Sequence, residues 1–232
     1  MLRGLYSAAG GMQATSHQQD ATSQNLSHAM KPGYRREIVR FESIGQPQDI
    51  VAPLNSLHTD FSTGILEFTG GEFDVALNGP GFFSVQGPNG PLYTRNGVFQ
   101  LNGQSQIVTP DGLLVQSATG GPIAVPVDAG RSIEILADGS VVSNGAVVDQ
   151  IKITAFKDPT ELQRAGSTYF QALPDTETTP VTSEVRHGYR ELGNTTVVHE
   201  MVQMLAGARL FDATQRALRQ IGETIALNTR PK

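Results

Sequence analysis

The side chains best suited to chemistry in this chain are a few histidines and a set of aspartates that lie beside or near glycines. The histidines are His17, His28, His58, His187 and His199. None of them forms the His-x-x-x-His spacing that places two metal ligands on one face of a helix. We therefore expect surface or core histidines and no bound metal ion.

The aspartates Asp74, Asp111, Asp138 and Asp149 are the remaining candidates, because two carboxylates that meet in space can hydrolyse a glycosidic bond. Their turn positions favour local hydrogen bonding instead. The sequence has no phosphate-binding loop and no nucleophile elbow, and Gly79-Pro80-Gly81 lacks the third glycine of a dinucleotide fingerprint. Without cysteine there is also no disulfide, thiolate nucleophile or Cys-bound zinc. We expect no enzyme activity and no cofactor.

Both ends of the chain have the spacing of long amphipathic helices. Residues 2–29 contain two rows of side chains in which the members are seven positions apart. The main row is Leu5, Met12, Gln19, Leu26, and the companion row is Leu2, Ala9, Ser16, Ser23. In residues 194–227 the two rows are Val197, Met204, Phe211, Leu218, Ile225 and Met201, Ala208, Gln215, Gly222. Such rows form the seam of a coiled coil. The small residues of the first seam suit the bulkier residues of the second.

Local signals set the ends of these helices. Pro32-Gly33 should stop the first helix, because proline disfavours helical conformation in the residue before it. Asn194 is a plausible N-cap for the last helix. Residues 42–64 combine prolines and glycines with isolated apolar residues, so we expect an extended connector there.

The middle of the chain consists of short strand-like segments separated by turns. Asn-Gly and Asp-Gly pairs recur from Asn89-Gly90 to Asn144-Gly145, and these pairs favour tight hairpins. Strand-like segments lie between them, at 73–77, 82–85, 113–116, 133–136 and 147–156. Because no helical crossover separates the strands, the sheet should be antiparallel.

These patterns predict an α+β fold in which the N- and C-terminal helices pair as a coiled-coil-like domain and the middle is antiparallel and all-β. The expected boundaries are 1–35 and 190–232 for a discontinuous helical assembly domain, 36–65 for the extended connector, and 66–189 for the β-rich domain. A helix with an apolar stripe must bury it against the other helix or a neighbouring subunit. The sequence therefore indicates assembly rather than catalysis.

Charge and hydropathy argue against a nucleic-acid-binding protein, a conventionally secreted protein and a membrane-spanning protein. The 232 residues are 38% hydrophobic, which is enough for a core, and the net charge of -5 favours no nucleic-acid partner. The one basic run, Lys31, Arg35, Arg36 and Arg40, is interpreted as a solvated helix end. The N-terminus lacks the charged and apolar regions of a secretory signal, and no apolar run is long enough for membrane insertion.

The residues resemble the bacterial flagellar rod and hook protein family. The opening run Leu5-Tyr6-Ser7-Ala8-Ala9-Gly10-Gly11-Met12 is similar to the start of that family. So are segments further along the chain, namely Asn25-Leu26-Ser27, Gly33-Tyr34-Arg35, Phe73 to Gly79, Gly81-Phe82-Phe83 and Tyr93 to Gly97. At the C-terminal end the match continues through Gly188-Tyr189, Glu191, Asn194 and residues 197–211. His28 and Thr196 stand where the family usually has asparagine, which puts any contact that needs an amide there in doubt.

The resemblance implies a structural rod subunit that polymerises helically around the export channel, between motor and hook. Its partners would be copies of itself, other rod and hook subunits, the flagellar type III export apparatus and the surrounding ring proteins. It would lie in the periplasm-spanning basal body, after export without a cleaved signal peptide. The expected assembly interface is Leu2, Leu5, Ala9, Met12, Leu26, Val197, Met201, Met204, Ala208, Phe211, Leu218 and Ile225. The family-motif residues are Asn25, Gly33, Tyr34, Gly81, Phe82, Phe83, Gly188, Tyr189 and Asn194.

Within the family, the short connector and the lack of an extra β-domain argue against the longer hook protein. The form of residues 42–82 and the tail Ala208-Arg209-Leu210-Phe211 slightly favour a proximal over a distal rod position. Two other classes stay open. A secreted β-domain enzyme would need a pocket with perturbed carboxylates, and a phage-tail-like subunit or adhesin would be absent from purified basal bodies.

Overall fold

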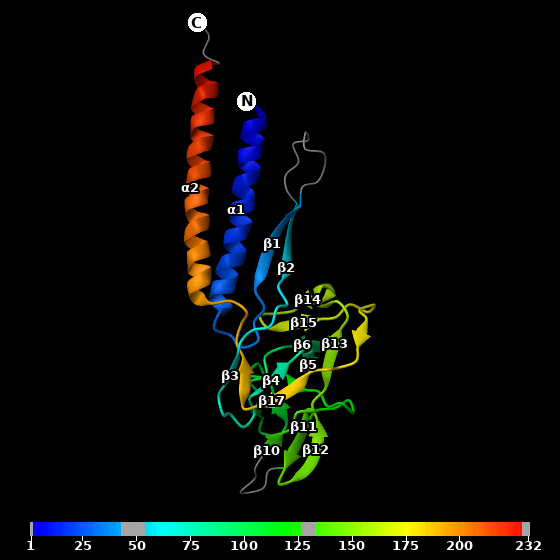
Figure 1. Ribbon diagram of the computed structural model, residues 1–232. Helices are drawn as coiled ribbons and strands as arrows, with labels where there is room; N and C mark the ends of the chain where they lie inside the picture. The colour runs from blue at the N-terminus through cyan, green and yellow to red at the C-terminus, as the bar shows by residue number, and fades with distance from the viewer. Residues whose placement is uncertain (1, 43–53, 127–132, 229–232) are drawn as a thin grey trace. The chain divides into compact units, whose positions relative to one another are not determined.

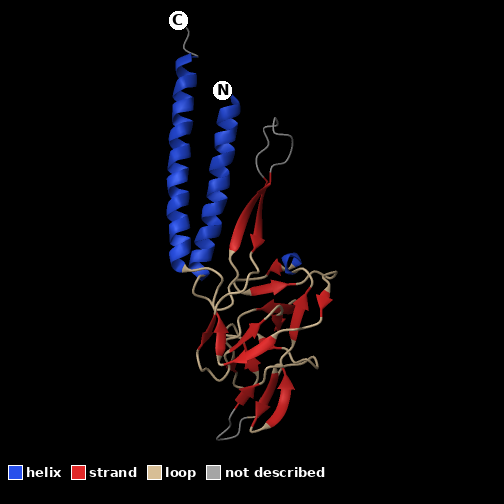
Figure 2. Ribbon diagram, in the orientation of Figure 1, coloured by secondary structure: helices blue, strands red, loops and turns tan. Residues whose placement is uncertain are grey.

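The chain has one long helix at each end and strands between them (Figure 2). The computed structural model describes residues 2–42, 54–126 and 133–228. The helices are α1 (Leu2–His28) and α2 (Val197–Asn228), and η1 (Pro159–Glu161) is a single 3-10 turn. No helix in the described ranges is long and apolar enough to cross a bilayer.

The strands follow one another closely between the two helices. They are β1 (Glu37–Glu42), β2 (Leu54–Thr59), β3 (Leu66–Phe68), β4 (Val75–Asn78), β5 (Phe82–Gly87), β6 (Gly90–Thr94), β7 (Gln100–Leu101), β8 (Ile107–Val108), β9 (Leu114–Val115), β10 (Ile133–Ile135), β11 (Ser140–Ser143), β12 (Ala146–Gln150), β13 (Ile153–Phe156), β14 (Gln163–Arg164), β15 (Tyr169–Gln171), β16 (Thr178–Thr179), β17 (Glu184–His187) and β18 (Tyr189–Glu191). Every pairing between described strands is antiparallel. The expected α+β class with an antiparallel middle is therefore confirmed.

The chain divides into two compact units, which we describe separately. The helical unit contains residues 1–29, 36–60 and 195–232, and the β unit contains residues 30–35 and 61–194. The chain therefore passes from one unit to the other after residues 29, 35, 60 and 194.

In the helical unit, α1 contacts both α2 and the strand pair β1–β2 (Figure 1). The two strands pair in continuous register from Glu37 opposite Thr59 to Glu42 opposite Leu54. Within the expected extended connector, 36–65, residues 37–42 and 54–59 instead form a pair of strands. The expected helical boundary at residue 35 also differs, since residues 30–35 belong to the β unit.

In the β unit, the largest sheet has the strand order β14-β15-β6-β5-β9-β8-β7, and β13 pairs with both β5 and β16. A smaller sheet has the order β10-β11-β12, and two strand pairs, β17-β4 and β18-β3, complete the unit. The turn between β11 and β12 follows the sequence expectation: Asn144 and Gly145 both have positive φ, at 52° and 80°. Two successive positive φ values are the requirement of the tight hairpin turn that Asn-Gly favours.

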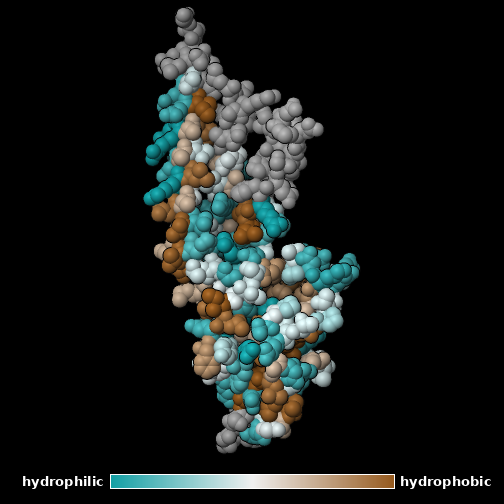
Figure 3. All heavy atoms as spheres, viewed as in Figure 1, coloured by the Kyte–Doolittle hydropathy of each residue, from teal (hydrophilic) through white to brown (hydrophobic). Residues whose placement is uncertain are grey.

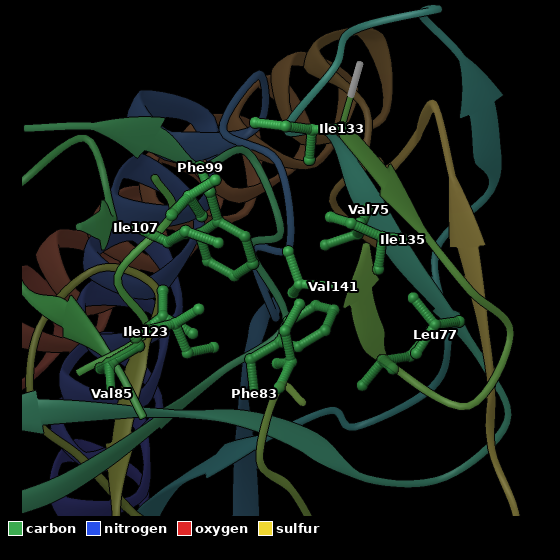
Figure 4. Close-up of a cluster of buried hydrophobic side chains, with 14 of the residues drawn as sticks. Val75, Leu77, Phe83, Val85, Phe99, Ile107, Ile123, Ile133, Ile135 and Val141 are labelled. Carbon is green, nitrogen blue, oxygen red and sulfur yellow. The ribbon is translucent and has the colours of Figure 1, made fainter. Parts of the chain in front are cut away.

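The core of the β unit consists of aliphatic side chains around two phenylalanines. Side chains from β4, β5, β8, β10 and β11 converge on Phe83 and Phe99, whose rings meet edge to face at 5.3 Å (Figure 4). A second cluster is aromatic, with Phe82, Phe156, Leu162 and Phe170 buried together. Burial of such side chains contributes about 1.5–3 kcal/mol each. The core therefore fixes the strands that carry the motif residues described below.

Candidate assembly interface

The histidines and aspartates singled out in the sequence are the candidates for a metal-binding or catalytic group. Within the described ranges no cluster of three histidine or acidic side chains could hold a metal ion. Three histidines each contact a different polar residue: His58 Nε2 lies 2.8 Å from Ser56 Oγ, His187 Nε2 lies 2.9 Å from the Glu72 carbonyl, and His199 Nε2 lies 3.4 Å from Arg36 Nη1. His17 lines a groove and His28 is half-buried in α1.

Each candidate aspartate is hydrogen-bonded to a neighbouring side chain. Thr69 donates to Asp74 at 2.5 Å, Tyr169 to Asp111 at 2.6 Å, and Ser117 to Asp149 at 2.5 Å. Burial raises the pKa of the Tyr169 hydroxyl, and its bond to the Asp111 carboxylate raises it further. The backbone N–H of Ser140, and then its hydroxyl, lower the pKa of Asp138. These contacts shape turns and strands, as carboxylates near glycines commonly do.

The two helices contact each other, and several residues of the seam expected from sequence are half-buried. Met12 and Leu26 of α1 are half-buried, and so are Val197, Met204, Ala208, Phe211 and Leu218 of α2. A Cβ added at Gly207 would lie 3.0 Å from Gln19 Oε1, so the helices approach closely there. Leu2, Leu5 and Ala9 lie in α1 and Ile225 in α2, but their side chains fall outside the described part of the structure.

Of the companion row expected in α2, only Ala208 is half-buried within the helical unit. Met201 is 57% exposed, whereas Glu200 is 1% exposed. Gln215 and Gly222 are also exposed, and the less exposed row is Glu200, Gly207, Thr214 and Ile221. Glu200 is buried with partners for its charge, because its carboxylate accepts a hydrogen bond from Thr195 Oγ1 at 2.5 Å and lies 3.8 Å from the Arg36 guanidinium. A carboxylate is buried readily only with such partners.

The opposite side of α1 is attached to β1 by Asn25. This side chain is buried, its Nδ2 donates to the Glu37 carbonyl at 2.8 Å, and its Oδ1 accepts from the Glu37 N–H at 2.8 Å. The Asn25 amide therefore bonds both backbone groups of Glu37, as a neighbouring strand would. The sequence pattern gave no sign of this role of Asn25.

A groove lies between α1 and the β1–β2 pair, with a volume of about 320 Å³. It is lined by His17, Asp20, Ala21, Gln24, Glu37, Val39, Ser56 and Leu57. The lining thus combines acidic and aliphatic residues.

The motif Gly33-Tyr34-Arg35 belongs to the β unit and is fully buried. Gly33 has a φ of 69°, and a Cβ there would lie 2.3 Å from the Asn96 nitrogen, so only glycine fits. Its N–H donates to the Glu191 carbonyl at 2.7 Å. Arg35 was expected in a solvated basic run; that interpretation was wrong, because Arg35 Nη2 donates to Glu191 Oε1 at 2.6 Å with both side chains fully buried.

Glu191 is the centre of a buried ionic cluster. Besides Arg35 it accepts the Gly64 N–H at 2.8 Å, and Arg95 Nη1 lies 3.5 Å from its second oxygen. Burial lowers the pKa of Arg95 to about 10, which leaves it charged at neutral pH. Two cations therefore share one carboxylate inside the β unit. Such a cluster is costly to disrupt and fixes the geometry of its members.

Arg164 also contacts the segment Gly33-Tyr34-Arg35. Its guanidinium lies 5.2 Å from the ring centroid of Tyr34 and 5.1 Å from that of Phe170. It also donates to the Arg35 carbonyl at 2.5 Å. Cation–π contacts and a charge-assisted hydrogen bond therefore hold residues 33–35 in the β unit. Sequence reasoning did not find Arg164, because its partner Arg35 lies 129 residues away in the chain.

The remaining motif residues have structural roles. Phe82 and Phe83 are buried in the two cores, preceded by Gly81 at a φ of 126°. Gly188 has a φ of 73° and Tyr189 packs on Phe68 at 5.2 Å. Asn194 was expected to cap the last helix, but its Nδ2 donates to the Ser62 carbonyl at 3.2 Å. Thr196 takes the capping position, accepting the His199 N–H at 3.3 Å, so an amide is not needed there.

Comparison with known proteins identifies relatives over nearly the whole chain. Residues 76–143 match the flagellar hook protein FlgE/F/G D1 domain family. The chain is 27% identical to flagellar basal-body rod protein FlgG of Bacillus subtilis (strain 168), covering 94% of each chain. It is 29% identical to flagellar basal-body rod protein FlgF of Escherichia coli (strain K12), again covering 94% of each. The FlgF protein of Rhizobium meliloti (strain 1021) is 28% identical over 94% of this chain.

Proposed function

Because this chain belongs to the flagellar basal-body rod protein family and is a structural subunit rather than an enzyme, we propose that α1 and α2 pair as a coiled coil that polymerises into the rod. The observation that carries this proposal is the half-buried row of α2 that faces α1. Met204, Phe211 and Leu218 recur every seven residues along it. That spacing is the repeat of a coiled-coil seam.

The helical unit alone leaves much of α2 uncovered. Val198, Met201, Val202, Leu205 and Leu210 are all more than half exposed. A helix with apolar side chains on several faces needs more than one neighbour. Copies of the same chain and other rod or hook subunits are the proposed neighbours, and non-closing contacts between copies would produce a helical array around a channel.

The proposal extends to the route and the place of assembly. The subunit would be exported by the flagellar type III apparatus without a cleaved signal peptide. It would then join the periplasm-spanning rod, next to the surrounding ring proteins. The relatives carry both the FlgF and the FlgG name, so the weakly favoured proximal position remains a prediction.

The substitution Phe211→Asp tests this function. A charge on the seam would cost on the order of a few kcal/mol in helix pairing, so the variant should be secreted but missing from purified basal bodies. Ala213→Asp is the matched control, because Ala213 is exposed two residues further along the same helix. Normal incorporation of the Phe211→Asp protein would refute the proposal.

A further inference from the structure

The β unit is continuous with the helical unit through three short segments of its own chain, 30–35, 61–64 and 191–194. We call them the exit segments. Residues 30–35 carry two of the four crossings between the units, and each of the other segments carries one. Any load that passes along the chain into the β unit must travel through them. The contacts among the exit segments therefore decide how firmly the chain is held there.

Glu191, in the third exit segment, bonds both of the others. Its carbonyl accepts the Gly33 N–H at 2.7 Å, and its Oε1 accepts the Gly64 N–H at 2.8 Å. The same Oε1 accepts a hydrogen bond from Arg35 Nη2 at 2.6 Å. One residue thus joins all three exit segments, through its backbone and its side chain together.

Asn194 joins the three exit segments a second time, three residues further along. Its N–H donates to the Tyr34 carbonyl at 3.2 Å. Its Nδ2 donates to the Ser62 carbonyl at 3.2 Å and lies 3.1 Å from the Ser62 hydroxyl. We call the bonds made by Glu191 and Asn194 the exit network.

Two arginines connect the exit network to the aromatic core of the β unit. Arg95 Nη1 lies 3.5 Å from the Glu191 carboxylate, and the Arg95 guanidinium lies 5.3 Å from the ring centroid of Phe82. Arg164 bonds the first exit segment and lies 5.1 Å from the ring centroid of Phe170. Both rings are buried in the same core cluster. The network is therefore attached to packed side chains.

The centre of the exit network is closed to other molecules. The side chains of Arg35 and Glu191 are fully buried, so neither contributes to the mixed hydrophilic and hydrophobic surface that Figure 3 shows. Apolar side chains of similar volume are often as stabilising as a buried ion pair, and the best-attested use of such a pair is to specify one arrangement. The arrangement specified here is that of the chain's own segments.

We propose that the exit network is a mechanical joint, which fastens the three exit segments to one another and to the aromatic core so that they open as one cooperative unit. This inference rests on the proposed function, because a rod between motor and hook carries load. Segments that were anchored separately would yield one at a time. Joined segments share the load, and none opens until all of them do.

Hydrogen exchange of the full-length chain, resolved at single amides by NMR, tests this cooperativity. The N–H groups of Gly33, Gly64 and Asn194 lie in different exit segments, and we expect one opening free energy and one urea dependence for all three. In Asn194→Ala, exchange at Gly33 and Gly64 should become about three- to tenfold faster, the effect of one lost hydrogen bond, although the Asn194 Nδ2 bonds Ser62 instead.

The matched control is Asn78→Ala, which changes an exposed asparagine of the same unit and should leave exchange at Gly33 and Gly64 unchanged. The N–H of Ile107, bonded to the Ile123 carbonyl in the core, reports unfolding of the whole unit and should accelerate less than the exit segments. Unchanged exchange at Gly33 and Gly64 in Asn194→Ala would overturn the joint. So would equal acceleration in the control or at Ile107.

A disulfide rescue separates the joint from general stability, since the chain has no cysteine of its own. Glu191→Gln should accelerate exchange at Gly33 by more than about tenfold. Ser62→Cys with Asn194→Cys then ties two exit segments, whereas Asn78→Cys with Glu184→Cys ties opposite residues of β4 and β17. Both bonds close long loops, so both should raise the urea midpoint by similar amounts.

Only the bond between positions 62 and 194 should slow exchange at Gly33 again, and only this bond should restore swimming of the Glu191→Gln strain in viscous medium. Equal recovery with the bond between positions 78 and 184 would show a general stability effect and overturn the joint. Normal incorporation of Phe211→Asp into basal bodies would instead overturn the proposed rod function, and the exchange measurements on the isolated chain would still decide whether the exit segments open together.

Discussion

The buried ionic cluster gives the sharpest stability prediction, through the substitution Glu191→Gln. The amide keeps the size of the side chain and an oxygen for the Gly64 N–H, but it removes the negative charge that faces two buried guanidiniums. Loss of one partner from a buried pair costs about 3–5 kcal/mol. That is a large fraction of the roughly 5–15 kcal/mol by which a domain is stable.

Urea unfolding of the full-length chain, followed by far-ultraviolet circular dichroism, measures this loss. With an m-value of about 2 kcal/mol/M, the midpoint of the β unit should fall by roughly 1.5–2.5 M. Glu67→Gln is the matched control, because Glu67 pairs with Arg190 at 2.6 Å on the surface, where such pairs contribute about 0–1 kcal/mol. A shift for Glu191→Gln no larger than that of the control would refute the role assigned to the cluster.

Other predictions concern single residues. Asn25→Ala removes both bonds to the first residue of β1 and should cost about 1–3 kcal/mol, seen as faster hydrogen exchange in that strand, while Ser27→Ala on the exposed side of α1 should have little effect. Gly33→Ala should lower the thermal midpoint strongly because of its positive φ and the nearby backbone, whereas Gly103→Ala, with open space around its Cβ position, should be neutral or slightly stabilising. The lowered pKa of Asp138 means that its stabilising effect is present above its unfolded pKa and is lost as the pH falls through the lower folded value. Urea midpoints should therefore fall less steeply in Asp138→Asn than in the native chain at pH values below about 4; parallel pH profiles would contradict this.

The helices and the antiparallel middle could be predicted from sequence because both depend on local periodicity. The heptad rows include Phe211, which lines a cavity with Gln19 of α1, and Asn144-Gly145 marked a hairpin. Within the helical unit Glu200 is buried and Met201 is exposed, although hydrophobicity alone favours burial of the methionine. Only the contacts with Thr195 and Arg36 explain the buried carboxylate.

Features that depend on distant partners were not visible in the sequence. Arg35 looked like part of a solvated basic run, but its partner Glu191 lies 156 residues further along the chain. The strand pair β1–β2 was hidden because its second strand, Leu54–Thr59, is largely polar and has no clear alternation. The two-sided bonding of Asn25 depends on the position of β1, which no local pattern specifies.

The central claim is that this chain is a rod subunit that assembles through its terminal helices. The most direct measurement is quantitative mass spectrometry of basal bodies purified from the source bacterium, comparing the native chain with a version that lacks residues 2–29. The native chain should be present in the purified basal bodies, and the shortened chain should be absent from them. Its amount in the culture fluid separates lost assembly from lost export. Absence of the native chain from purified basal bodies, or normal incorporation of the shortened chain, would contradict the account.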